Sequence, residues 1–180
     1  MERTELIDML ARLQLAGMRA NLDDILAKGR RRRHSIEEVL GDLLKAEIAE
    51  KQARSIRYQL GAAKLPLAKE LADFDFTDTP INEALVRELA TGDFLTHQRN
   101  AVFVGGTGTG KSHLAIAIAR TCIRNGAKGR FFNVVDLVNR LEAEAKTGRP
   151  GHLADALARV DLVVLDDLGY LPFAHSGGQL

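Results

Sequence analysis

The first third of the chain has the spacing of apolar residues that is typical of amphipathic helices. From Leu6 to Leu26, apolar side chains recur mainly at steps of three and four residues. Ser35, with Glu38 three residues later, predicts a capping box at the start of a second amphipathic helix that runs towards Leu60. Residues 1–64 are therefore expected to form an all-helical N-terminal module. Two glycines mark the expected bend and end of the first helix, Gly17 and Gly29.

The next stretch is less regular and is expected to be a linker. Residues 65–96 begin with a proline at position 66, continue with alternating aspartate and phenylalanine, and end with a short helix expected around residues 81–89. Phe74 and Phe76 are expected to anchor this linker by packing on the domain that follows. A border to an adenine pocket is the alternative for the same two rings.

From residue 97 onwards, short apolar runs alternate with segments that suit helices. Three runs are the expected strands: 101–104, 130–135 and 161–165. Asp136 is placed to cap the helix after the second run, and a short helix is expected at residues 152–159. Strands that alternate with helices predict an α/β fold with a parallel sheet, whose ligands gather at the carboxyl ends of the strands. Residues 97–180 are therefore expected to form a ligand-binding α/β domain.

Eight residues between the first apolar run and the following helix indicate which ligand the domain binds. This octet matches the phosphate-binding loop, or Walker A pattern, G-x-x-x-x-G-K-[ST] in full. Glycines let backbone N–H groups converge on phosphate oxygens, the lysine supplies a positive charge, and the serine hydroxyl serves Mg²⁺. The ligand expected here is a nucleoside triphosphate with Mg²⁺. The residues are Gly105, Gly106, Thr107, Gly108, Thr109, Gly110, Lys111 and Ser112.

The third apolar run ends in two aspartates, which is the Walker B arrangement. Asp166 is the expected second Mg²⁺ residue, on the side opposite Ser112. Asp167 is placed to orient or deprotonate the water that attacks the γ-phosphate. The loop and the aspartate pair both fall on the carboxyl edge of the expected sheet, so together they predict a nucleotide site.

Composition and charge limit the remaining function classes. With a net charge of +1, the chain of 180 residues is not expected to coat nucleic acid generally. The block Arg30–Arg33 could contact DNA phosphates, or it could be a solvated linker or a charge cluster favourable at a helix C-terminus. The single cysteine, Cys122, is expected to be a small buried side chain in a cytoplasmic protein. Neither a membrane span nor a zinc site is expected.

Several of these segments resemble one family across nearly the whole chain. They are Leu13–Met18, Ala62–Pro66, Phe74–Phe76, Gly105–Ala115 and Leu165–Pro172. The chain is similar to the IstB-like ATP-binding proteins, helper ATPases of insertion-sequence transposition. These proteins are relatives of the DnaC helicase loaders within the AAA+ class of P-loop NTPases.

The resemblance implies that the nucleotide is ATP and that homo-oligomers bind DNA. It also implies that the N-terminal helices contact DNA or the partner protein. It also implies delivery of target DNA to a transposase. The family's site residues match positions of this sequence one by one. The resemblance implies that residues 105–112 and His113 bind the nucleotide and that Ser112 and Asp166 bind Mg²⁺. Asp167 stands where many relatives have glutamate, so a carboxylate is kept with a shorter reach.

Only three strands are expected from residue 101 onwards, whereas nucleotide-binding sheets usually have about five. The family places a further strand with a γ-phosphate sensor between the loop strand and the Walker B strand. An arginine finger and a helical lid come later. The sequence is therefore expected to be an incomplete AAA+ domain, with an empty slot between the two halves of its Mg²⁺ site.

Three functions fit these expectations. The first is an ATP-binding helper of DNA transposition that works with a transposase. The others are a DnaC-like helicase loader and a fragment that binds DNA or a partner without hydrolysing ATP. A P-loop kinase is a weaker fourth because no arginine-rich lid is visible.

Overall fold

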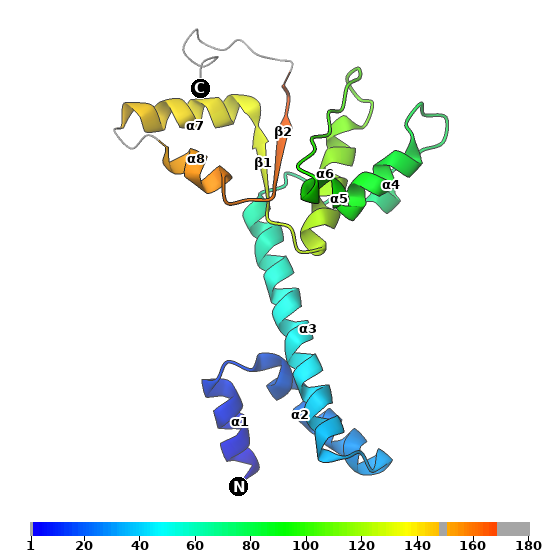
Figure 1. The fold of residues 1–180 in the computed structure, drawn as a ribbon, viewed down its shortest axis with the longest axis vertical. Helices are drawn as coiled ribbons and strands as arrows, with labels where there is room; N and C mark the ends of the chain where they lie inside the picture. The colour runs from blue at the N-terminus through cyan, green and yellow to red at the C-terminus, as the bar shows by residue number, and fades with distance from the viewer. Residues whose placement is uncertain (1, 148–150, 169–180) are drawn as a thin grey trace. The chain divides into compact units, whose positions relative to one another are not determined.

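The computed structural model describes residues 2–147 and 151–168, which form two compact units (Figure 1). The first unit comprises Met1–Arg57 and the second Tyr58–Leu180. A long helix, α3 (Ile36–Ala63), begins in the first unit and ends in the second. The end of the segment Leu165–Pro172, from Gly169 onwards, lies outside the described residues.

The first unit contains α1 (Arg3–Arg12), α2 (Ala16–Arg32) and the first part of α3. The expectation of one helix bent near Gly17 is wrong, because the chain leaves helical geometry at Gln14, where φ is 58°. Gly29 does not end α2 either. A Cβ built there would lie 2.7 Å from Val39 Cγ2, so this glycine gives α3 room to pack. The capping box of α3 is confirmed: Ser35 Oγ accepts from Glu38 N, and Ser35 N donates to Glu38 Oε2.

A small apolar core holds the three helices together. Its buried residues are Leu10, Met18, Leu22 and Leu43. The buried carboxylate of Glu47 accepts hydrogen bonds from Gly17 N and Met18 N, at 2.8 and 3.1 Å, and so caps the start of α2. Burial alone would raise the pKa of Glu47, but these donors and the Lys51 ammonium outweigh it, and the pKa lies below the ordinary 4.5.

Gly17 is the residue that lets α2 approach α3 this closely. A Cβ added there would lie 2.4 Å from Ala46 O, which is backbone and cannot turn aside. We therefore expect Gly17→Ala to destabilise the first unit by about 1–3 kcal/mol, the usual cost of overpacking. Gly61→Ala is the matched control in α3, since an added Cβ there meets nothing within 4 Å. Thermal unfolding that is the same for both variants would contradict this close approach.

The second unit is a small parallel sheet with helices around it. Its helices are η1 (Leu71–Asp73), α4 (Glu83–Thr91), α5 (Asp93–Thr96), α6 (Lys111–Arg124), α7 (Val134–Lys146) and α8 (His152–Leu157). Its strands are β1 (Gly129–Asn133) and β2 (Leu162–Asp166). No helix within the described residues is both long enough and apolar enough to cross a membrane.

The two strands pair in parallel, from Gly129 opposite Leu162 to Asn133 opposite Asp166. Their carboxyl ends therefore meet at one edge, as the alternation of strands and helices predicts. The expected strand at residues 101–104 is not a strand in the structure, because no described segment forms a ladder with it. Val102 and Val104 are accordingly exposed.

The core of this unit forms around α6. Its buried residues come from α4 and α6: Val86, Ala90, Leu114, Ile118 and Cys122. Phe74 and Phe76 pack against this cluster from the linker, which confirms their expected packing role. Cys122 is buried as expected, and burial raises the pKa of its thiol. The segment at 65–96 thus packs with the loop-bearing helix.

Candidate nucleotide-binding site

The octet Gly105–Ser112 forms a loop that leads into the first turn of α6. Gly110 lies immediately before the helix with φ at 85°, a conformation that favours glycine. The first hydrogen bond of the helix runs from Leu114 N to Gly110 O at 2.9 Å. The N–H groups of the three preceding residues, Lys111 to His113, therefore have no acceptor within the helix. A helix N-terminus of this kind suits an anion such as phosphate.

The side chain of Lys111 turns back over this loop. Its Nζ donates to Gly106 O at 2.6 Å, and Thr109 Oγ1 donates to the same oxygen at 2.9 Å. The ammonium is thus already held against the loop by an oxygen acceptor. Phosphate oxygens are charged and accept more strongly than a carbonyl, so they can compete for this donor. The loop residues fit a phosphate group.

Ser112 and Asp166 meet directly, although 54 positions separate them. Ser112 Oγ donates to Asp166 Oδ1 at 3.0 Å, which joins the start of α6 to the end of β2. This hydrogen bond therefore connects the two halves of the site, between which an empty slot was expected. One hydroxyl and one carboxylate would provide two of the six oxygens that Mg²⁺ prefers, and phosphate and water usually supply the others. Within residues 2–147 and 151–168, no three side chains of metal-binding type cluster together.

Asp167 follows with φ at 63° and lies on the exposed edge of the sheet. Its Oδ2 accepts from Asn133 Nδ2 at 2.9 Å, at the end of the neighbouring strand. Asn133 also caps α7, since its Oδ1 accepts from Val135 N at 3.0 Å. The expectation that Asp136 caps α7 is therefore wrong. Sequence reasoning missed Asn133, although an asparagine between an apolar strand and a helix is a capping signal.

The linker touches the loop from the other side. A Cβ built on Gly110 would lie 2.4 Å from the ring of Phe74, so only glycine fits beside this phenylalanine. The Phe74 ring also meets His113 edge-on, with centroids 5.2 Å apart. His113 Nε2 lies 3.0 Å from Glu70 O, which can only accept, so the ring donates. The side chain of His113 thus faces the linker, and its backbone N–H belongs to the first turn of α6.

Glu70 fastens the linker to α6 a second time. Its carboxylate accepts hydrogen bonds from Arg120 at 2.9 Å and from Arg124 at 2.5 and 2.6 Å. The hydrogen bonds from Arg124 are the main reason why the pKa of Glu70 lies below its ordinary 4.5. Partial burial opposes the shift, and Arg120 adds to it. Sequence reasoning missed this charged cluster because its members are about 50 residues apart.

An open hollow of about 730 Å³ borders Asp166 on the side of β1 and α7. Phe131, Asn133 and Arg140 line it, together with Lys64, which follows the end of α3. Arg140 lies over the ring of Phe132, 5.6 Å from its centroid. The carboxylate expected to serve Mg²⁺ is therefore reachable by small molecules.

The charge of Glu70 should stabilise the second unit in a pH-dependent way. The pKa of Glu70 is lower in the folded state than in the unfolded state. The carboxylate therefore stabilises the fold at pH values above its unfolded pKa, and this stabilisation is lost as the pH falls through its folded pKa. We expect Glu70→Gln to lower stability by about 1–2 kcal/mol at neutral pH, and this deficit to shrink in acid. Glu88→Gln on the exposed face of α4 is the control. Thermal unfolding across pH checks this, and a constant deficit would contradict it.

The amino-acid sequence of this chain is similar to those of known proteins. The family described as IstB-like ATP binding protein matches residues 8–180. A Geobacillus stearothermophilus protein named as an ATP-binding protein of insertion sequence IS5376 is 40% identical over 138 residues, which are 76% of this chain and 55% of that protein. A Pseudomonas aeruginosa protein, named likewise for insertion sequence IS21, is 30% identical over 98% of this chain and 67% of its own length. The expected P-loop α/β fold class is thereby confirmed, and the chain belongs to the family of IstB-like ATP-binding proteins.

Proposed function

We propose that this chain binds ATP with Mg²⁺ at the loop 105–112 and acts as a helper of insertion-sequence transposition. One observation carries the proposal: the Ser112–Asp166 hydrogen bond of 3.0 Å, which brings the two expected Mg²⁺ residues together beside the phosphate loop. The names of the relatives support the ATP and insertion-sequence parts. Bound Mg²⁺ would neutralise charge on the outer phosphates.

Each site residue has a role in this proposal. The N–H groups of the loop and of the first turn of α6, including that of His113, donate to phosphate oxygens, and Lys111 adds the positive charge. Ser112 and Asp166 hold Mg²⁺. Asp167, kept in place by Asn133, orients the water that attacks the γ-phosphate.

The nucleotide part of the proposal depends on the Lys111 ammonium. We expect Lys111→Ala to weaken binding of a fluorescent ATP analogue at least tenfold, which corresponds to about 1.4 kcal/mol. Lys146→Ala removes an exposed lysine at the end of α7 and is the control. Titration in the presence of Mg²⁺ measures both variants, and equal affinity of Lys111→Ala and the wild type would overturn the assignment of the loop.

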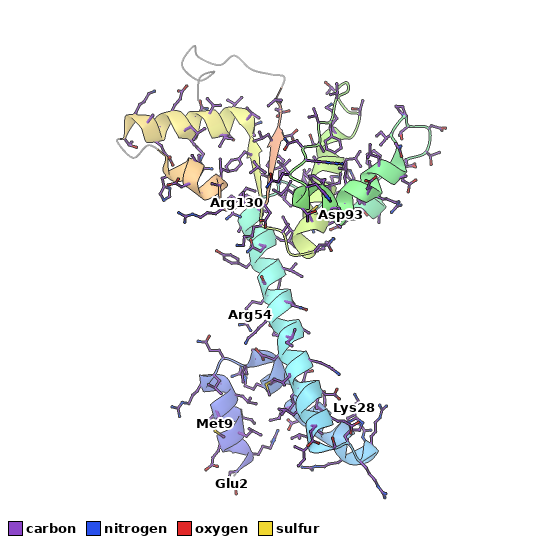
Figure 2. All side chains as sticks on the ribbon, in the orientation of Figure 1. Glu2, Met9, Lys28, Arg54, Asp93 and Arg130 are labelled. Carbon is purple, nitrogen blue, oxygen red and sulfur yellow. The ribbon has the colours of Figure 1, made fainter. Side chains whose placement is uncertain are left out.

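We further propose that Arg30–Arg33 contact DNA phosphates and that the chain works with a transposase. The four side chains are exposed at the C-terminal end of α2, and none forms an ion pair with any described residue. A hollow of about 440 Å³ beside them is lined by Lys28, Arg31 and Arg32 with Asp24. Figure 2 shows Lys28 in this region, from which many side chains project. Clustered cations of this kind bind phosphate backbones without reading sequence.

Replacing all four arginines by glutamine tests the DNA contact. We expect weaker binding to duplexes of any sequence and a shallower dependence of affinity on salt, because fewer counterions are released. The control replaces four exposed cations of the second unit by glutamine: Arg87, Arg99, Lys128 and Lys146. Fluorescence anisotropy at several salt concentrations measures both effects. An unchanged salt slope after loss of the four arginines would rule the block out.

A further inference from the structure

The phosphate loop is exposed except at its end. Residues 105–109 are exposed, whereas Gly110 and the two residues that follow it are half-buried. Glycine has more backbone freedom than any other residue, so its conformation in a folded protein depends on the atoms around it. The group that lies against Gly110 therefore has a large influence on the shape of the loop.

The ring of Phe74 lies against Gly110. The three atoms nearest to a Cβ built on this glycine all belong to the ring and lie no more than 3.7 Å away. Gly110 has φ at 85°, and the ring fills the space beside it. The ring thus closes one side of the turn through which the loop enters α6.

One side of α6 holds the segment that ends at Phe74. His113 Nε2 donates to Glu70 O at 3.0 Å, in the first turn of the helix. Arg120 and Arg124 bind the carboxylate of the same glutamate, in the later turns. Positions 113, 120 and 124 lie on one side of a helix because they are seven and four residues apart. Segment 70–74 is thus attached to α6 from its first turn to its last.

A single turn, η1, separates Glu70 from Phe74. Asp73 N donates to Glu70 O at 3.2 Å, which closes this turn. Phe74 N donates to Leu71 O at 3.3 Å. The ring of Phe74 also packs against that of Phe76, with centroids 4.8 Å apart. Because hydrogen bonds close the turn, the attachment of Glu70 to α6 fixes the place of the Phe74 ring.

We propose that Phe74 is a positioning residue of the phosphate loop, kept in place by the attachment of segment 70–74 to α6. Its ring holds Gly110 in the conformation that directs the N–H groups of the first helical turn towards phosphate. Detachment of the segment therefore lowers the affinity of the loop for a triphosphate. This effect on affinity rests on the nucleotide role proposed above, whereas the contact between Phe74 and Gly110 does not.

A contact with the adenine base is the alternative role for the Phe74 ring. The two roles differ in the part of the ligand on which they act. Positioning of the loop affects every ligand that carries a triphosphate, whereas a contact with the base affects only the nucleotide. Inorganic tripolyphosphate has no base, so it separates the two roles.

The first experiment measures binding of tripolyphosphate and of ATP, each with Mg²⁺, to the 180-residue chain by titration calorimetry. We expect Phe74→Leu to weaken both ligands by the same factor, at least fivefold. Phe76→Leu is the matched control, because this ring packs against the same apolar cluster, and it should bind tripolyphosphate within twofold of the wild type. A loss confined to ATP would assign Phe74 to the base, and equal losses in the two variants would show a general effect of packing. Either result would overturn the proposal.

Amide hydrogen exchange without ligand tests the contact between Phe74 and Gly110 by itself. Leu114 N donates to Gly110 O, and the exchange of this amide reports how often the first turn of α6 opens. Measured by NMR, the exchange should be at least threefold faster in Phe74→Leu than in Phe76→Leu. Equal rates would contradict the proposal even if the wild type binds ATP. A wild type that binds neither ligand would instead overturn the nucleotide role, and this comparison would still decide whether Phe74 holds Gly110.

Arg124 tests the attachment of segment 70–74 from a distance. It is the last of the 14 residues of α6, so it lies about 20 Å from the start of the helix and cannot reach a phosphate there. Arg124→Ala should weaken tripolyphosphate binding at least twofold, with no further loss in a chain that already carries Phe74→Leu. Lys128→Ala removes an exposed cation just after α6 and should bind like the wild type. Independent losses from Arg124→Ala and Phe74→Leu would show that Arg124 does not act through Phe74.

Discussion

The burial of α6 is the constraint on which the candidate nucleotide site depends. Its side chains at Leu114, Ile116 and Ile123 are almost fully buried, and each contributes about 1.5–3 kcal/mol through burial. The same helix packs against α4, η1 and β2. Because α6 is held on several sides, its first turn has a fixed direction, and the phosphate loop is attached to that turn. The apolar core of the second unit thus orients the polar site.

Polar contacts then fix the details of the site. The Ser112–Asp166 bond ties the start of α6 to the sheet, and the Asn133–Asp167 bond joins the ends of the two strands. On the opposite side, Glu70 and Phe74 attach the linker to the same helix. The linker is therefore a packed part of the second unit, since its ring at Phe74 leaves room only for glycine at position 110. Substitutions in the linker should therefore affect the phosphate loop.

Local sequence signals predicted much of this arrangement. The octet, the apolar strand that ends in two aspartates and the Ser35 capping box each depend on residues close together in the chain, and the structure has each where it was expected. The roles of the site residues remain predictions. Signals that depend on distant partners were missed or misjudged. Gly29 looked like a helix end because its contact with Val39 is not visible in the sequence, and residues 101–104 have the apolar pattern of a strand but no partner in the described chain. Contacts such as Glu70 with Arg124 cannot be inferred from spacing.

We propose that Gly105–Ser112 and the first turn of α6 bind the phosphates of ATP. Hydrogen–deuterium exchange measures this most directly, because backbone N–H groups that donate to phosphate exchange more slowly. With ATP and Mg²⁺, we expect slower exchange in the peptides that cover residues 105–113, and no such change in Lys111→Ala. Unchanged exchange across this loop at saturating ATP, or protection confined to other segments, would show that the phosphates do not bind here.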